Sequence, residues 1–342
     1  MKLTSIKKLG GRRGQSCAIA ERETGTAVGP ATRFTDPASV ETWDAYFRWR
    51  EGDVLRDVTI DDTWWRVIDA VASPERAMAA LWAHRYFDAF SRWRLLPDER
   101  LLRSAGTDRR PDLFEPPAAV LNVSAFVSAP MGGAPRFERT AFVETAVLAV
   151  RLLDDAMSAK RVAVGDAGLR IGVIGFGDAL RKLGVPYTAF AAQEQARQLA
   201  QALAEGCLRG AVALAEERGA FASGTASPAM VLRWEAQQLP QDLIVSAARN
   251  GVRHARLTAL DRHPLLARLA NGISDALDPT PVALQATRLA DPTLVTAEQT
   301  ISAAMQPWID APIGGAEAAL AALVRAAESA SGQDNATPGL PA

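Results

Sequence analysis

The sequence predicts an α-rich α/β fold with a helical N-terminal region, and three observations support this prediction. Long stretches carry apolar residues at three- and four-residue steps, the period of an amphipathic helix, whereas short apolar runs typical of strands are few. Hydrophobic residues make up 48% of the 342 residues, which allows a sizeable core. No segment repeats at a fixed period, which argues against a solenoid.

The N-terminal helical region is predicted over residues 36–107. A helix begins in "TIDDTWWRVIDAVAS", where Thr59 and Asp62 have the spacing of a capping box. Ser73 then caps a second helix, "PERAMAALWAHRYFDAFSRWR", which is expected to end near Arg94. Four of its apolar side chains share one side of the helix at four-residue steps: Met78, Trp82, Tyr86 and Phe90.

A proline-rich connector over residues 108–120 leads into residues 121–330. There "LNVSAFV" predicts a short strand, and "RTAFVETAVLAVRLLDDAMSA" predicts an amphipathic helix. "TAFAAQEQARQLAQALAEGCLRGAVALAEERGAF" predicts a long helix. "LPQDLIVSAARNGVRHARLTAL" predicts a helix, a turn at Asn250-Gly251 and a strand. "TAEQTISAAMQPWIDAPIGG" and "AEAALAALVRAAES" predict two closing helices.

Both ends of the chain are expected to lie outside the folded core. Residues 1–35 have no sustained periodicity and indicate a mobile basic arm, and residues 331–342 indicate a disordered tail. The arm carries four clustered cations, Lys7, Lys8, Arg12 and Arg13. We expect them to be solvated, and contact with nucleic acid is the weaker alternative.

Charge, apolar content and cysteine usage narrow the class of protein. The formal net charge of −1 provides no general attraction to nucleic acid or to an anionic membrane. No apolar run approaches the roughly 20 residues of a membrane helix, and the basic N-terminus lacks the apolar stretch of a secretory signal. Two cysteines, Cys17 and Cys207, make no disulfide framework and no zinc motif. We therefore expect a cytoplasmic protein without a membrane partner.

The segment "GLRIGVIGFGDAL" poses the question of a nucleotide loop. Its glycines, Gly172, Gly175 and Gly177, lack the G-x-G-x-x-G spacing of a dinucleotide fingerprint. The preceding "AVGDAG" is predicted to be a loop, with no strand leading in. The preferred interpretation is close helix packing at positions where a side chain would not fit.

Other residues that often carry chemistry favour structural roles. His84 is expected to be a packing histidine, and His254 to precede a strand. The neighbours Asp154 and Asp155 point in different directions on a helix, so they form no ready acid–base pair. Cys207 lies in the long helix, where a buried, small, apolar role is typical. No residue is predicted to be catalytic and none to bind a metal.

Several segments, in order, resemble the large subunit of adenosylcobalamin-dependent (class II) ribonucleotide reductase over roughly residues 43–325. "VLAVRLLDDAMSA" followed by "GLRIGVIGFGDALRKLGVPY" is the most specific match, and "TIDDTWWRVIDAVAS", "RWRLLPDERLLRSAGT" and "LNVSAFV" are similar to earlier family segments. The later "LPQDLIVSAARNGVRHARLTAL" and "ISAAMQPWIDAPIGG" are similar to family segments in the same order. The resemblance implies a truncated derivative of the reductase barrel, with an incomplete sheet. Open strand edges would then need cover, so we expect a homodimer or a protein partner.

The chain also departs from the family where its chemistry resides. The connector is short, and no cysteine lies between Cys17 and Cys207. The thiols that the family uses for its radical and its dithiol therefore have no counterpart, and no glutamate matches the family's acid. Adenosylcobalamin is implied by the resemblance alone.

The family's phosphate loop falls opposite "LDRHPL", and "NGISDALDP" is similar to a family turn downstream. The resemblance thus implies a nucleotide or phosphate site at five residues: Arg262, His263, Asn271, Gly272 and Ser274. Judged on residues 262 and 263 alone, a turn with exposed charges is the simpler interpretation. The resulting hypothesis is a catalytically degenerate reductase-like protein that binds a nucleotide or a protein partner. The alternative is an active adenosylcobalamin-dependent ribonucleoside-diphosphate reductase.

Overall fold

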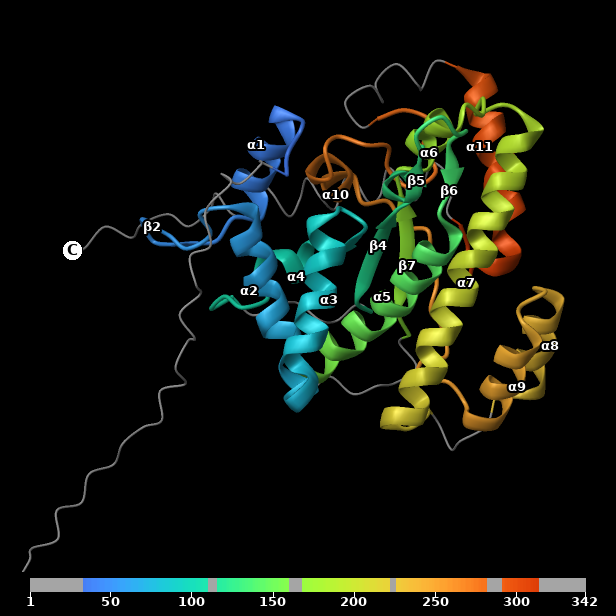
Figure 1. Cartoon of the computed structure of the whole chain (residues 1–342), viewed down its shortest axis with the longest axis horizontal. Helices are drawn as coiled ribbons and strands as arrows, with labels where there is room; N and C mark the ends of the chain where they lie inside the picture. Colours follow the sequence, from blue (N-terminus) through green and yellow to red (C-terminus); the bar gives the residue numbers. More distant parts are fainter. Residues whose placement is uncertain (1–32, 110–115, 160–167, 222–225, 282–290, 314–342) are drawn as a thin grey trace, which may run out of the picture. The chain divides into compact units, whose positions relative to one another are not determined.

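A computed structural model describes residues 33–109, 116–159, 168–221, 226–281 and 291–313. Figure 1 shows two central strands, with helices of the N-terminal region on one side and later helices on the other. The α-helices are α1 (Pro37–Tyr46), α2 (Ile60–Ala72), α3 (Ala79–Ser91), α4 (Glu99–Ser104), α5 (Arg139–Ala159), α6 (Phe176–Leu183), α7 (Phe190–Arg218), α8 (Pro228–Ala236), α9 (Gln241–Asn250), α10 (Pro264–Leu269) and α11 (Pro292–Met305). The strands are β1 (Arg50–Glu51), β2 (Val54–Leu55), β3 (Leu95–Pro97), β4 (Ala118–Asn122), β5 (Val127–Ser128), β6 (Arg136–Phe137) and β7 (Arg170–Ile174). Short 3-10 helices are η1 (Ser73–Met78), η2 (Val123–Phe126) and η4 (Gln306–Trp308).

The N-terminal helices form largely where the apolar pattern predicts. The capping box of α2 is confirmed, because the Thr59 side chain accepts a hydrogen bond from the Asp62 amide and the Asp62 carboxylate accepts one from the Thr59 amide. The predicted second helix is wrong in its first turns, which are the 3-10 helix η1, and α3 ends at Ser91, before Arg94. Met78 consequently falls outside the buried face and is 48% exposed, whereas Tyr86 and Phe90 are fully buried.

The sheet is mixed and has the order β3-β4-β7. Strand β3 runs antiparallel to β4, with Leu96 opposite Val120, and β4 runs parallel to β7, with Val120 opposite Gly172. Two sequence expectations are corrected here, and one strand forms where the sequence made no prediction. Residues 95–97 form a strand that was not expected, β4 starts at Ala118 inside the predicted connector, and residues 123–126 turn into a 3-10 helix. All five residues of β4 are buried, which is typical of a central strand.

The outer edge of β7 is covered by the same chain. The amide of Ile171 donates to the Leu257 carbonyl (3.0 Å), and the amide of Ala259 donates to the Ile171 carbonyl (3.1 Å). The predicted strand after Asn250-Gly251 is reduced to this single bridge at Thr258. Over the described residues the sheet does not close into a barrel. A second copy is therefore not needed to cover this edge, and the homodimer stays a prediction.

The glycine segment is a strand, a left-handed residue and a helix. The expectation that no strand leads in is wrong, because β7 includes Gly172. Gly175 follows with φ of +74°, a conformation that favours glycine, and α6 begins directly after it. A Cβ atom on Gly177 would lie 2.4 Å from the Asp278 carbonyl oxygen, so the backbone of residues 278–279 lies directly against the start of α6. Close packing, the preferred interpretation of these glycines, is confirmed.

Helices α5 and α7 were predicted in type and extent, and they pack against each other. Gly206 and Gly210 of α7 permit the contact, because a Cβ on Gly206 would lie 2.6 Å from the Ala146 Cβ. Helix α5 also packs against the sheet and against α2. Cys207 lies in α7 and is fully buried, as predicted.

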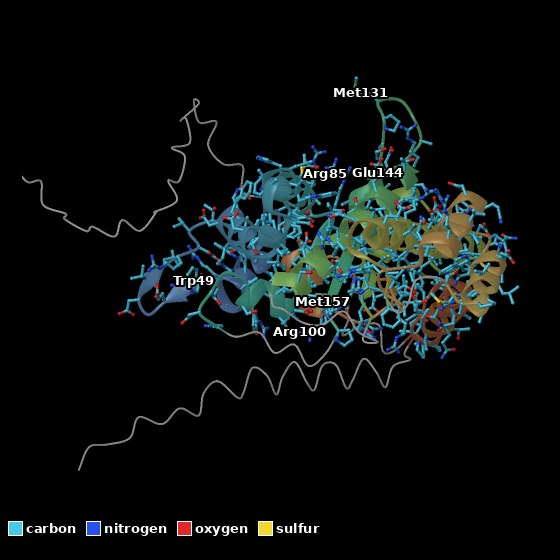
Figure 2. The ribbon with its side chains drawn as sticks, turned by 90° about the horizontal axis from the view of Figure 1, so that it is seen from below. Trp49, Arg85, Arg100, Met131, Glu144 and Met157 are labelled. Carbon is cyan, nitrogen blue, oxygen red and sulfur yellow. The ribbon has the colours of Figure 1, made fainter. Side chains whose placement is uncertain are left out.

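The periphery carries features that the sequence did not indicate. Strands β5 and β6 form a hairpin that ends in a Pro- and Gly-rich loop, where Met131 is fully exposed and projects from the rest of the ribbon (Figure 2). His84 is exposed and lies outside the core, so the packing role expected for it is limited to a T-shaped ring contact with Trp65, with 5.9 Å between the ring centroids. None of the helices in the described part combines the length and apolar character that crossing a bilayer requires.

Some predictions fall on residues outside the described ranges. These are the basic arm up to residue 32 with Cys17, residues 110–115 of the connector, the helix in "AEAALAALVRAAES" and the tail over residues 331–342. The last residues of the predicted arm are described, and they are held in place. Arg33 forms an ion pair with Asp61 (2.5 Å), and Phe34 lies against Trp43 and Trp93.

Candidate functional site

A largely buried set of charged and polar side chains joins the second half of α5 to the C-terminal end of α7. We call it the buried ionic cluster, and its members are Glu75, Tyr86, Arg151, Asp154, Asp155, Glu217, Arg218, Arg253 and His254. They come from η1, α3, α5, α7 and the segment after α9. The cluster therefore connects the N-terminal helices with the later part of the chain.

Asp154 is the most connected carboxylate of this cluster. It is fully buried and binds Arg218 Nη1 (2.5 Å), Arg253 Nε (3.0 Å) and His254 Nε2 (2.9 Å). Burial acts to raise the pKa of Asp154, but the bonds from His254 and Arg253 hold it well below its usual range. Asp154 is accordingly an anion throughout the physiological range.

Asp155 is buried beside Asp154, but its pKa is shifted in the opposite direction. It accepts a hydrogen bond from the Tyr86 hydroxyl (2.5 Å) and pairs with Arg218 (2.7 Å). Burial and the nearby Glu75 raise its pKa to about 7, against the lowering effect of Tyr86 and Arg218. The two neighbouring carboxylates therefore differ in their readiness to hold a proton.

The remaining members complete the charge balance. Arg151 bonds Glu75 (2.5 Å) and Glu217, and its guanidinium lies 4.1 Å from the centroid of the Trp82 ring. Arg218 also reaches Glu75. Because each carboxylate meets at least one arginine, the cluster is suited to hold helices together and offers little to a ligand.

His254 is the exception, and it connects the cluster to a pocket. Its side chain is fully buried, Nε2 binds Asp154, and Nδ1 has no hydrogen-bond partner. The same residue lines a small hollow between α7, α8 and the segment that follows η4, with a cavity volume of about 50 Å³. We call this hollow the α7–α8 pocket; its other lining residues include Cys207, Trp234, Leu239, Thr258 and Trp308.

The polar groups of the α7–α8 pocket are mostly bonded to one another. Arg233 forms an ion pair with Asp310 (2.7 Å), whose second oxygen accepts from the amides of Leu257 (2.7 Å) and Thr258 (3.0 Å). The Trp308 indole donates to the backbone carbonyl of residue 237 (2.8 Å). The pocket therefore has a mixed polar and apolar lining, and its charge pair is neutralised.

Cys207 adjoins this pocket as a fully buried residue. Burial, with a contribution from Asp310, raises the pKa of its thiol well above the usual value. The thiol is consequently protonated and poorly nucleophilic. Within the described part of the chain it is the one free cysteine.

The predicted phosphate residues Arg262 and His263 lie together, and both have carboxylate partners. Arg262 binds Asp278 (2.6 Å) and Glu298 (3.1 Å). His263 Nδ1 lies 3.2 Å from Glu99, and burial is outweighed by Glu99, which raises the pKa of His263 to about 9. The expectation of exposed charges in a turn is therefore wrong, since both side chains are mostly buried within ion pairs.

The other three predicted residues form the turn after α10. Asn271 and Gly272 have φ of +67° and +69°, and the Asn271 side chain accepts from the Thr35 amide (2.7 Å). The amide of Ser274 donates to Asp178 in the first turn of α6 (2.7 Å), and Ser274 is fully buried. These contacts attach the turn to α6 and to the start of the described chain, and phosphate binding here stays a prediction.

The His263–Glu99 pair predicts a dependence of stability on pH. The pKa of His263 is about 9 in the folded chain, against an ordinary histidine pKa of 6.5, so its stabilising charge is fully present below pH 6.5 and is lost as the pH rises through 9. We expect the free energy of unfolding, measured with urea, to fall by about 1 to 2 kcal/mol between pH 7.5 and 9. H263Q should remove this fall, whereas H84Q, at an exposed position, should keep it. An equal fall in H263Q and the unsubstituted protein would contradict the assignment.

Sequence reasoning missed the residues that the fold brings together most closely. Asp154 and His254 are 100 positions apart, and no local pattern links them. The sequence shows Asp154 and Asp155 as an acidic pair but does not show that both are buried. The two carboxylates share Arg218 and otherwise have different partners. The sequence does contain an indication of this burial. Asp154 and Asp155 lie among apolar residues of α5, a helix with many buried side chains, and charged residues in such surroundings are usually paired.

Of two comparisons with known proteins, one finds no match and the other matches part of the chain. A search of curated proteins finds no match for this chain. Residues 118–261, from the start of β4 to the segment after the Thr258 bridge, match the family model described as "Ribonucleotide reductase, barrel domain". The matched range contains β4, β7 and the α5–α7 pair, and it ends just before Arg262 and His263. The chain is therefore similar to ribonucleotide reductase over residues 118–261.

Proposed function

We propose that this chain is a ribonucleotide reductase-like protein without reductase turnover of its own, which acts by binding a nucleotide or a protein partner. One observation carries the proposal. Cys207, the cysteine that the described residues contain, is completely buried and has a protonated thiol.

The reaction of the family sets the requirement. A thiyl radical must remove a hydrogen atom from the ribose, and a dithiol must then supply the two electrons that reduce the sugar. The whole sequence contains two cysteines, Cys17 and Cys207, which cannot serve as a radical thiol and a separate dithiol together. Function has to be argued from the site, and the family relation alone does not restore these groups.

Adenosylcobalamin is implied only by the family resemblance, and the described residues do not fit its use. The cofactor supplies a radical that a nearby thiol receives, and the described part of the chain has only the buried Cys207 to receive it.

Nucleotide binding is part of the proposal, and it requires a phosphate to displace carboxylates from Arg262 and His263. At Arg262 and His263 a phosphate would have to compete with Asp278 and Glu99, which already bind the two cations. Binding of a partner protein is the other possibility in the proposal. An open edge of β7 does not support it, because residues 257–259 of the same chain already bond to that edge.

A turnover assay tests the proposal. We expect no deoxynucleotide from ribonucleoside diphosphates when adenosylcobalamin and a dithiol are supplied, and the same background from the C207S variant. Turnover that disappears in C207S would overturn the proposal and favour the alternative, an active class II reductase.

Two binding measurements separate the branches of the proposal. Heat on titration with nucleotide, lost in R262A, supports nucleotide binding; absence of heat at millimolar nucleotide ends that branch. Light scattering after size exclusion reports a homodimer, and a clean monomer counts against a second copy as the partner.

A further inference from the structure

The described chain opens with three residues that belong to no helix or strand, residues 33–35, which we call the N-terminal strap. The strap lies against the first turn of α2, the residues after α3 and the turn after α10, through contacts with Asp61, Trp93 and Asn271. We call the surface that these elements present to it the strap groove. Because the strap is part of no helix or sheet, it can leave the groove without breaking either.

The strap groove binds the main chain of the strap as a neighbouring strand would. The carbonyl of Arg33 accepts from Trp93 Nε1 (2.9 Å) and from Asn271 Nδ2 (3.3 Å), and the amide of Thr35 donates to Asn271 Oδ1 (2.7 Å). One primary amide thus satisfies an acceptor and a donor on either side of Phe34. Main-chain pairing of this kind is how proteins recognise an extended peptide of another chain.

One side of the strap groove selects an arginine. The Arg33 guanidinium binds both carboxylate oxygens of Asp61, through Nε (2.5 Å) and Nη2 (3.1 Å), and Nη1 donates to the Ser91 carbonyl (3.1 Å). Its central carbon also lies 5.5 Å from the centroid of the Phe87 ring. A lysine ammonium cannot reproduce this planar, two-pronged contact, so the groove distinguishes arginine from lysine.

The other side of the strap groove selects an aromatic ring. The Phe34 ring lies 6.0 Å from the Trp43 ring and 5.5 Å from the Trp93 ring, both within the range of favourable aromatic pairs. Trp93 and Asn271, which bond the strap main chain, have φ of +55° and +67°, and only four non-glycine residues of the described chain have a positive φ. Such backbone strain is concentrated at binding and switch sites.

We propose that the strap groove is a recognition site for an extended Arg-Phe segment of a partner protein, and that the N-terminal strap occupies it as an autoinhibitory contact until the partner displaces it. The groove is open to solvent, since Arg33 and Asp61 keep 30% and 36% of their side-chain surface exposed. The proposal rests on the partner-protein possibility in the proposed function, and it specifies the chemistry of that partner. A tethered strap has a local concentration on the order of millimolar, so it competes strongly with a free peptide.

A peptide with the sequence of the strap tests the groove in the full-length chain. The double substitution R33A/F34A removes both side chains of the strap and leaves the groove residues intact. We expect the fluorescently labelled peptide ATRFTD, the sequence of residues 31–36, to bind this variant at least tenfold more tightly than it binds the unsubstituted protein. The control peptide ATAATD should not bind. Absence of ATRFTD binding to the variant, equal binding to both proteins or equal binding of both peptides would each overturn the proposal.

A pair of asparagine substitutions, each added to R33A/F34A, locates the peptide. N271G removes the primary amide and keeps the left-handed backbone, which glycine adopts freely, so it should weaken ATRFTD binding at least tenfold. N250A is the control, because Asn250 at the end of α9 bonds Glu216 and Ser246 and has no contact with the strap. Equal peptide binding by the N271G and N250A variants overturns the location.

Hydrogen exchange in the unsubstituted chain provides a test that needs no variant to fold. A large excess of ATRFTD should displace the strap and speed exchange of the Thr35 amide at least threefold, whereas ATAATD should leave its rate unchanged. An unchanged rate with both peptides overturns the proposal. Failure of the peptide tests leaves the turnover assay of C207S unaffected, and turnover in that assay would overturn the proposed function without altering the peptide result.

Discussion

Replacing Asp154 with alanine is expected to cost about 3 to 5 kcal/mol of unfolding free energy, a loss large enough to unfold a marginally stable domain. The physical reason is that Arg218, Arg253 and His254 all direct donors at this one buried carboxylate. Without it, two guanidinium groups stay in a low-dielectric site with less compensating charge. Urea denaturation followed by tryptophan fluorescence measures the change.

The matched control is an aspartate whose ion pair lies in water. Asp88 pairs with Arg92 at 2.8 Å, but both side chains are more than half exposed, so D88A should cost less than about 1 kcal/mol. A D154A variant no less stable than D88A would show that the buried ionic cluster contributes nothing to the fold. A D154A variant that is unfolded in water agrees with the prediction.

Substituting Gly177 with alanine is expected to destabilise the chain by about 3 kcal/mol, although alanine is the better helix former. A Cβ atom at this position would lie 2.4 Å from the Asp278 carbonyl oxygen and 2.6 Å from that of Pro279. Backbone cannot swing aside as a flexible side chain does, so residues 274–279 must move. Their movement would break the bond between the Gly175 amide and the Ser274 carbonyl, now 2.7 Å.

Hydrogen exchange distinguishes this mechanism from a general loss of stability. The amides of Gly175 and Ser274 should lose protection in G177A. The control is G184A at the other end of α6, where φ of +71° strains alanine by about 1 kcal/mol but no atom lies within 4 Å of its Cβ. That variant should keep both amides protected. Loss of protection at these amides in G184A but not in G177A would refute the argument.

The sequence predicted best where structure is decided by neighbours along the chain. The capping box at Thr59 and Asp62 and the full extent of α5 follow from local spacing and helical period, and both are confirmed. It predicted worst where a strand depends on partners. Residues 95–97 and 170–174 are too short to show a period, and they become strands because β4 lies between them. The four residues of η1 that follow Ser73 and Pro74 form a 3-10 helix in place of the predicted α-helical turn.

The candidate site divides in the same way. The resemblance to a linear motif predicts the phosphate residues, among which Arg262 and His263 are neighbours in sequence. Their partners Asp278 and Glu99, which change the meaning of both cations, are 16 and 164 positions away. Charge along a sequence shows how many cations there are, and only the folded chain shows which of them are already paired.

By itself the sequence determined the helix-rich class, the similarity of its central part to a reductase barrel domain, and the small number of thiols. Helical period, motif order and the count of cysteines can all be read without knowing which distant residues meet in the fold. The tertiary structure alone decided that "GLRIGVIGFGDAL" is a strand followed by a packed helix start, that Asp154 and His254 meet across 100 residues, and that Nδ1 of His254 is left without a partner beside a pocket. These facts depend on which distant backbone and side chains share one buried space. No spacing along the chain records that.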